Sequence, residues 1–150
     1  MNLGIVGHAK EKFTPRTQVA AKRAIVRAIS EARAQSGEWP TIVSGRSPLG
    51  GVDVWAENIA RALGLKTLIF PPRVHRWSGP GGFRERNLEI ARHSDLVLVV
   101  VVRRLPPGYS GGIAFERCYH CARAGAPADH VKSGGCWTAH WAKAARWVVI

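Results

Sequence analysis

The sequence has little of several features that define whole classes of protein. Its longest apolar run, residues 96–102, has the length of a strand and is well short of the roughly 18 residues of a membrane-spanning helix. The start of the chain lacks the basic and apolar segments of a signal peptide. The 150 residues contain no internal repeat, low-complexity tract or linker. We therefore expect one cytoplasmic domain over residues 1–150, with no membrane partner.

Cysteine is also scarce, with three residues that all lie toward the C-terminus. An odd count in such a chain argues against a disulfide framework. The spacing C-x2-C-x8-H-x5-C could instead hold a zinc ion through Cys118, Cys121, His130 and Cys136. Four protein ligands would make residues 118–136 a structural zinc-binding insertion, with His120 and His140 as competing ligands. A redox-active thiol pair and buried, unreactive cysteines are the alternatives.

Acidic residues are few, since 10 Asp and Glu stand against 22 Lys and Arg, for a net charge of +12. Such an excess suits an anionic ligand or a polyanion such as nucleic acid. Charge spread along the chain is also found on ordinary protein surfaces, so both interpretations stay open.

What the sequence does contain is an alternation of strand-like and helix-like segments. Short apolar runs predict strands over 1–6, 41–44, 65–70, 96–102 and 146–150. Apolar residues at helical spacing predict helices that begin at Pro15 and that cover 52–63, 83–93 and 135–145. This order predicts an α/β fold, a Rossmann-like three-layer α/β/α domain with a mainly parallel sheet of about five strands.

In such a sheet, ligands bind beyond the carboxyl ends of the strands. We expect these loops to meet there: 7–16, 44–53, 71–86, 103–118 and 130–138. The loop 44–53 is the most informative, because its glycines permit a close approach of the backbone to an anion. Arg46 could pair with a phosphate. Asp53 could cap the following helix or accept a hydrogen bond from a ribose hydroxyl.

Three motifs along the chain are each similar to a block of one known family. They are Ser44-Gly45 with Gly50-Gly51-Val52-Asp53, Ala56 and Ala60; Arg86-Asn87 with Ile90, Ala91, Ser94 and Asp95; and residues 130–135 with Thr138. Together they resemble the SLOG superfamily, which includes YspA-like proteins, the LOG phosphoribohydrolases that activate cytokinins, and DNA-processing protein A. The resemblance covers nearly the whole chain. It implies a Rossmann-like fold, a nucleotide or nucleotide-like ligand, and a homo-oligomer.

The loops and motifs together give a set of candidate ligand-binding residues. They are Gly7, Lys10, Ser44, Gly45, Arg46, Gly50, Gly51, Asp53, Arg86, Asn87, Ser133, Gly134, Gly135 and Thr138. Arg86 is expected to bind phosphate and Asn87 to contact a hydroxyl or base. The alternatives are a helix-surface arginine and an amide that links two helices. Trp77 could stack on a base or pin its own loop. We expect no organic cofactor.

The LOG branch implies hydrolysis of the N-glycosidic bond of a nucleoside monophosphate by a catalytic glutamate. Here His140 lies near the place of that glutamate. A histidine can act as acid or base near neutral pH, but it cannot stabilise an oxocarbenium ion as a carboxylate does. The catalytic candidates are therefore His140 and Glu116, which follows a glycine pair and could face the ligand. Two other functions stay open: a nucleic-acid-binding module, like DNA-processing protein A, and a zinc-stabilised interaction domain without enzymatic activity.

Overall fold

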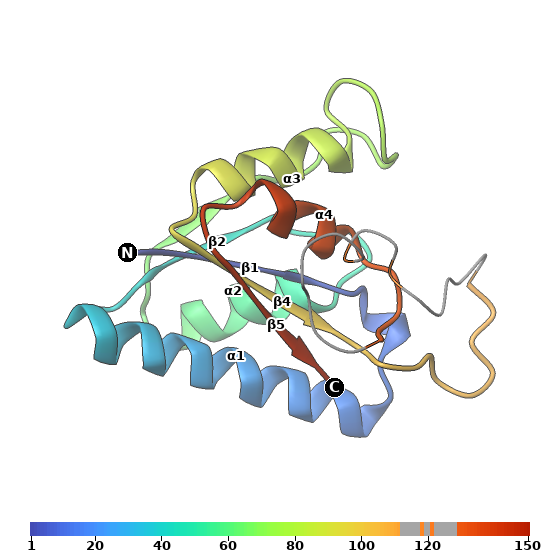
Figure 1. Cartoon of the computed structure of the whole chain (residues 1–150), viewed down its shortest axis with the longest axis horizontal. Helices are drawn as coiled ribbons and strands as arrows, with labels where there is room; N and C mark the ends of the chain where they lie inside the picture. Colours follow the sequence, from blue (N-terminus) through green and yellow to red (C-terminus); the bar gives the residue numbers. More distant parts are fainter. Residues whose placement is uncertain (112–117, 119–120, 122–128) are drawn as a thin grey trace.

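A five-stranded parallel sheet runs through the middle of the protein (Figure 1). This computed structural model describes residues 1–111, 118, 121 and 129–150. The strands are β1 (Asn2–Gly7), β2 (Thr41–Ser44), β3 (Thr67–Ile69), β4 (Leu96–Val101) and β5 (Ala145–Val149). They lie in the order β3-β2-β1-β4-β5, and every neighbouring pair is parallel. The predicted Rossmann-like α/β fold is confirmed.

Helices cover both faces of this sheet, which gives the three layers (Figure 1). On one face lie α1 (Pro15–Ser36) and α2 (Val52–Ala62), which contact each other and β1. On the other face lie α3 (Phe83–Arg92) and α4 (Gly134–Trp141), which pack together, with α4 against β4. A short 3-10 helix, η1 (Lys10–Lys12), joins β1 to α1.

The interior strand β4 shows why the sheet needs helices on both faces. Leu98, Val100 and Val102 pack into the apolar layer beneath α1 and α2. Val97, Val99 and Val101 pack into the opposite layer, beneath α3 and α4. Successive side chains of a strand point to opposite faces, so a continuous apolar run buries both. Burial on both sides accounts for the unbroken apolar stretch.

The longest helix, α1, is delimited by local signals in the sequence. Thr14 caps its first turn through a reciprocal pair of bonds with Thr17, and Pro15 occupies the first helical position. Gly37 ends the helix in the left-handed conformation, with φ of 77°. Neither α1 nor any other helix in the described part of the chain is long and apolar enough to cross a membrane.

The structure shortens two predicted elements. β3 covers Thr67–Ile69 rather than 65–70, because Leu65 is bonded to Ala60 at the end of α2 and β3 pairs only with the short β2. The last helix ends at Trp141 rather than at residue 145. Ala142 is extended, and Ala144 accepts a hydrogen bond from Val97. The chain must leave the helix early to place β5 beside β4.

The strand order creates one crevice at the carboxyl ends of the strands. β1 pairs with β2 on one side and with β4 on the other. The chain proceeds from β1 outward to β3 and then crosses back to β4 and β5. Parallel sheets of this kind bind ligands beside the strand at which the direction reverses. That place lies beyond the ends of β1 and β4.

Candidate functional site

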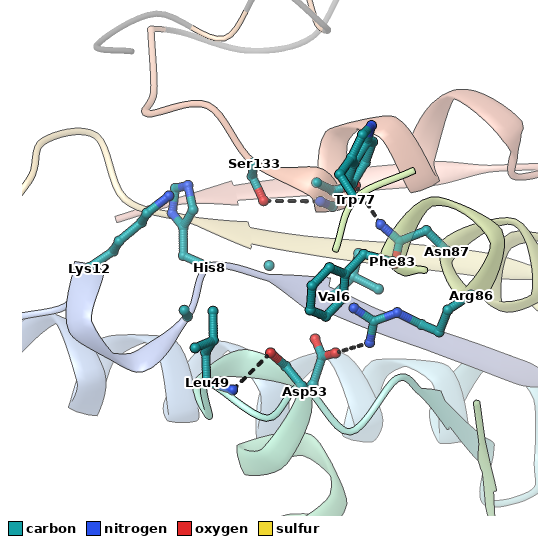
Figure 2. Close-up of a pocket in the computed structure, with 15 residues that line it drawn as sticks. Val6, His8, Lys12, Leu49, Asp53, Trp77, Phe83, Arg86, Asn87 and Ser133 are labelled. Carbon is teal, nitrogen blue, oxygen red and sulfur yellow. Dashed lines mark hydrogen bonds and ion pairs between the residues drawn. The ribbon is translucent and has the colours of Figure 1, made fainter. Parts of the chain in front are cut away.

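A pocket occupies the crevice beyond β1 (Figure 2). Its lining comes from the end of β1 and the loop after it, the loop before α2, the first turns of α2, α3 and α4, and the loop before α3. The lining residues are Val6, Gly7, His8, Ala9, Lys12, Ser47, Leu49, Asp53, Trp77, Phe83, Arg86, Asn87, Ser133, Gly134 and Gly135. The pocket therefore lies where the topology of the sheet predicts a ligand.

A buried ion pair forms the wall of the pocket between α2 and α3. Arg86 Nη1 donates to Asp53 Oδ2 at 2.9 Å, and the two side chains are 9% and 8% exposed. In Figure 2 the two side chains point toward each other along this wall. Burial raises the pKa of Asp53, while the Arg86 guanidinium and the Ser47 backbone oppose the rise. Arg86 Nε has no hydrogen-bond partner among the described residues.

Lys12 and His8 stand at the other end of the pocket (Figure 2). Burial lowers the pKa of the Lys12 ammonium. His8 Nδ1 lies 3.0 Å from the amide nitrogen of Val102, which can only donate, so the imidazole proton resides on Nε2 and is donated to the Lys132 carbonyl at 2.9 Å. Burial lowers the pKa of His8 to about 3, so this histidine is neutral and ties β1 to the segment before α4.

The opposite wall is built mainly from backbone at the start of α4. Ser133 caps the helix by accepting a hydrogen bond from the Gly135 amide at 3.0 Å. The carbonyl of Gly134 accepts a bond from Asn87 Nδ2 at 3.3 Å, which links α3 to α4. Trp77 lies over Gly134, and together with Phe83 it gives the pocket an aromatic side.

The structure brings half of the predicted ligand-binding residues together in this pocket. Those that line it are Gly7, Asp53, Arg86, Asn87, Ser133, Gly134 and Gly135. Those outside its lining are Lys10, Ser44, Gly45, Arg46, Gly50, Gly51 and Thr138. Thr138 is fully buried and donates to the Gly134 carbonyl within α4. Asn87 links α3 to α4, as the alternative interpretation predicted. It also faces the pocket.

The loop 44–53 contacts protein atoms rather than the pocket for most of its length. Arg46 Nε pairs with Glu57 Oε2 at 3.0 Å, and its side chain is 58% exposed and outside the pocket lining. Ser44 is buried and donates to the same carboxylate at 3.1 Å. A Cβ at Gly45 would collide with the Arg86 guanidinium, and one at Gly51 with the His8 carbonyl. These glycines allow parts of the protein to approach each other.

The two catalytic candidates are not found in the pocket. His140 lies in the last turn of α4, exposed and outside the lining. Glu116 lies outside the described residues, as does His120. Asp53 is the only carboxylate among the described residues that line the pocket.

Sequence reasoning missed the lysine that faces the pocket. The expected residue was Lys10, which is exposed in η1, whereas Lys12 lines the pocket. The turn of η1 decides between them, because a 3-10 helix rotates the chain by about 120° per residue. Leu49 and Phe83 were also missed. The sequence did show that Lys12 lies close to the end of the first strand. No periodicity indicated in which direction its side chain points.

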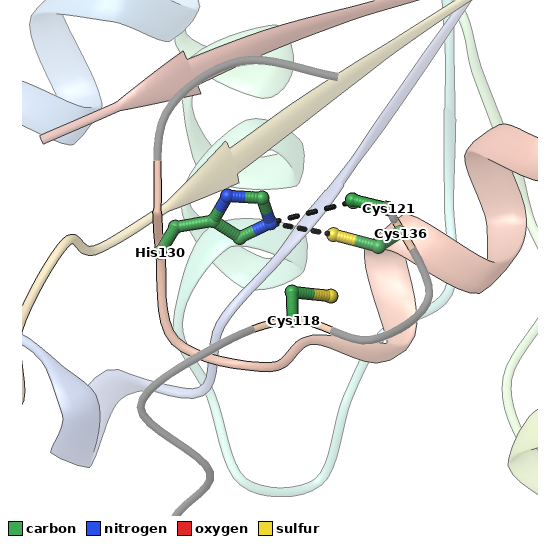
Figure 3. Close-up of side chains that lie close together, drawn as sticks. All are labelled: Cys118, Cys121, His130 and Cys136. Atoms are coloured by element: carbon green, nitrogen blue, oxygen red, sulfur yellow. Dashed lines mark hydrogen bonds between the residues drawn. The ribbon is translucent and has the colours of Figure 1, made fainter. Parts of the chain in front are cut away.

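A second candidate site is a cluster of the three cysteines and one histidine (Figure 3). The ligand atoms of Cys118, Cys121, His130 and Cys136 all lie within 4.8 Å of one another. His130 Nε2 is 3.4 Å from Cys121 Sγ and 3.2 Å from Cys136 Sγ. Zn–S bonds of about 2.3 Å place the sulfurs of a tetrahedral site about 3.8 Å apart. This set could therefore hold a metal ion such as zinc.

The surroundings of the cluster are apolar. Cys121 and Cys136 pack with the valines of β4 beneath α4, and His130 is 1% exposed. Burial raises the pKa of the Cys121 thiol to about 11. A hydrogen bond with Cys118, followed by burial, raises the pKa of Cys136. These thiols are protonated at neutral pH unless a cation displaces the protons.

No family model, curated protein or solved structure matches the chain. The resemblance of three motifs to the SLOG superfamily therefore stays a prediction from the sequence. What marks the pocket and the cluster as candidate sites is the placement of their own residues.

Proposed function

We propose that the pocket beyond β1 binds a nucleotide or a closely related phosphate-containing small molecule. The observation that carries this proposal is the Arg86 guanidinium in the pocket wall. Its side chain is 9% exposed and is paired with Asp53, and its buried Nε has no acceptor among the described residues. Arginine suits phosphate oxygens. An anionic ligand would meet the part of the guanidinium that lines the pocket.

The other lining residues suit the remaining parts of a nucleotide. Lys12 adds a second positive charge opposite Arg86, so the lining holds two formal cations and one carboxylate. The aromatic side formed by Trp77 and Phe83 offers faces on which a base could stack. Asn87 and Asp53 carry the polar atoms that could meet a hydroxyl or a base edge.

These residues support binding better than cleavage of a glycosidic bond. Asp53, the carboxylate of the described lining, is engaged with Arg86 and the Ser47 backbone. Glycoside hydrolysis generally needs a carboxylate free to act on the bond. We therefore propose that the protein senses or carries a nucleotide rather than cleaving it.

The cysteine–histidine cluster is proposed as a structural zinc site. Three thiolates and an imidazole form a soft ligand set that favours zinc over magnesium or calcium. Four protein ligands leave no coordination position for a water, which is the arrangement of structural rather than catalytic zinc. The burial of His130 and Cys136 agrees with such a closed site.

The nucleotide proposal is tested by thermal denaturation against nucleoside mono-, di- and triphosphates. A ligand that binds only the folded state raises the melting temperature with its concentration. Lys12→Met should weaken binding by about tenfold, or about 1.4 kcal/mol. Lys66→Met is the matched control, because Lys66 is exposed and outside the lining. The proposal fails if no nucleotide raises the melting temperature, or if the two variants lose affinity equally.

A polymeric nucleic acid is the second candidate, favoured by the charge around the pocket mouth. Arg73, Arg76 and Arg84 are exposed in the loop and first turn that flank Trp77. Binding to a polymer would weaken steeply as salt rises, because each neutralised phosphate releases counterions. A titration of single-stranded DNA at two salt concentrations separates the candidates. Strong, salt-sensitive binding without a mononucleotide effect would favour the polymer.

A further inference from the structure

One short segment belongs to both candidate sites. This segment leaves the cysteine–histidine cluster at His130 and forms the wall of the pocket at residues 133–135. It returns to the cluster at Cys136. Both of its ends supply a ligand atom to the same point, with Nε2 and Sγ 3.2 Å apart. The cluster and the pocket wall are therefore consecutive parts of one piece of chain.

Hydrogen bonds also attach the segment to its surroundings between these two ends, where Val131, Ser133 and Gly135 are buried. Val131 donates to the Val102 carbonyl at 3.0 Å, and the Lys132 carbonyl accepts from His8. The Gly134 carbonyl meets Asn87 at 3.3 Å. The Ser133–Gly135 and Cys136–Ser133 bonds are internal to the segment. Two adjacent glycines lie at its centre and add backbone freedom that the fold must restrain.

A metal ion would restrain this freedom directly. Bonds from His130 and Cys136 to one ion would close the segment into a short ring, while Cys118 and Cys121 would anchor that ring to a separate part of the chain. We propose that a thiophilic divalent metal ion at this cluster holds residues 131–135 in the conformation that forms the pocket wall. The ion thereby sets the affinity of the pocket for its anionic ligand. This second effect rests on the proposed function.

The coupling follows from the entropy of ordering. Without the ion, a ligand that needs the wall must order the segment as it binds, and part of its binding free energy is used for this. With the ion, the wall is already formed. Coupling between two sites is reciprocal, so the ligand must strengthen metal binding by the same factor. We expect a factor of about ten, within the range typical of such coupling.

The test compares metal-loaded with chelated protein by amide hydrogen exchange. The probe for the cluster is zinc alone, and its stoichiometry is read from metal content. Cobalt as a substitute gives the absorption bands of a tetrahedral thiolate site. We expect zinc to slow exchange in residues 131–136 by about tenfold or more, with β1 and β4 unchanged. Cys118→Ser should lose this protection, and Cys118→His should keep it, because histidine can still ligate zinc.

Chelation of the unsubstituted protein gives the same comparison if a variant fails to fold. Absence of zinc binding, or zinc binding without protection of 131–136, would overturn the proposal. Loss of protection throughout β1 and β4 on chelation would also overturn it, because the ion would then hold the whole domain rather than the wall.

The effect on ligand binding is measured by adding the nucleoside phosphates of the denaturation experiment to the metal-loaded and the chelated protein. Tighter binding to the metal-loaded form supports the coupling, and equal binding to both forms contradicts it. If zinc protects the segment and no nucleotide binds either form, the ordering of the wall is upheld. The proposed ligand and the coupling built on it then fail.

Discussion

The wall of the pocket between α2 and α3 and the wall at α4 are held in different ways. The first is closed by two charged side chains, Arg86 and Asp53, that are buried against each other. The second is closed by backbone groups of Ser133, Gly134 and Gly135, next to a cluster of soft metal ligands. The first depends on electrostatic pairing inside the protein. The second depends on how the chain between His130 and Cys136, with its two adjacent glycines, is held in place.

This difference shows how a motif can build a site without touching the ligand. At the first wall, Gly45 makes room for Arg86, and Arg46 neutralises Glu57. The glycines and the arginine of that loop shape the scaffold on which the ion pair rests. At the second wall, the glycines themselves form the lining. Glycine-rich loops can therefore serve packing or binding, and only their surroundings distinguish the two.

The largest expected effect comes from breaking the ion pair of the first wall. Arg86→Met leaves Asp53 buried without its countercharge, and loss of one partner of a buried pair costs about 3–5 kcal/mol. Urea denaturation of the variant measures the loss. The double variant with Asp53→Asn should recover much of the stability, since no charge then stays buried. A single variant as stable as the unsubstituted protein would contradict the buried pair.

The pH dependence of the stability of the same variant tests the direction of the pKa shift of Asp53. Burial raises the folded-state pKa of Asp53 above the ordinary value of 3.8, and removal of Arg86 removes the main opposing cause. The folded variant then binds more protons than the unfolded chain in the window above that value. Its free energy of unfolding must fall as pH rises through this window. The cost of Arg86→Met should therefore be smaller at acid pH than at neutral pH.

The link between β1 and the wall at α4 is expected to make the stability of the protein depend on pH. His8 joins β1 to Lys132, and its folded-state pKa of about 3 lies below the ordinary 6.5. Between these values the unfolded chain binds the extra proton, so stability falls as pH falls, by about 1.4 kcal/mol per pH unit. His8→Gln removes the titrating group. Denaturation of both proteins between pH 7 and 4 should give a shallower slope for the variant, and equal slopes would refute the assignment.

Two glycines with positive φ, Gly51 and Gly64, differ in how closely other atoms approach them. Gly51 has φ of 96°, and a Cβ there would collide with the backbone of residues 8–10, so Gly51→Ala should cost roughly 2–4 kcal/mol. Gly64 also has positive φ, of 67°, but nothing lies within 4 Å of the added Cβ. Gly64→Ala should cost only about 1–2 kcal/mol for the conformation itself. Equal losses in denaturation would mean that close approach at Gly51 is unimportant.

The smallest effect on ligand binding is expected at the residue that the sequence singled out for phosphate. Arg46→Ala removes the exposed partner of the buried Glu57 carboxylate, which keeps its hydrogen bond from Ser44, so the free energy of unfolding should fall by about 1–2 kcal/mol. Its side chain is outside the pocket lining, so nucleotide affinity should change by less than about twofold. Isothermal titration beside Lys12→Met makes the comparison. A loss at Arg46 as large as that at Lys12 would restore the interpretation based on the sequence.

The sequence predicted the cysteine–histidine cluster better than the pocket. The chain has only three cysteines and six histidines, and their spacing restricts which of them can converge on one ion. The four predicted residues do converge in the structure. Charged residues are common, so their presence near the end of a strand does not show whether their side chains point into the pocket. Lys10 and Lys12 lie in the same 3-10 turn and differ only in the direction in which their side chains point.

The sequence alone determined the α/β class, the order of the elements and the place of the crevice, because these follow from apolar periodicity and strand connectivity. The tertiary structure decided which cations face the crevice. Arg86 meets a partner 33 residues away in the chain, and His8 meets one 124 residues away. Such pairings depend on how the helices pack across the sheet. A local pattern carries periodicity, but the direction of a loop side chain is fixed only by its distant neighbours.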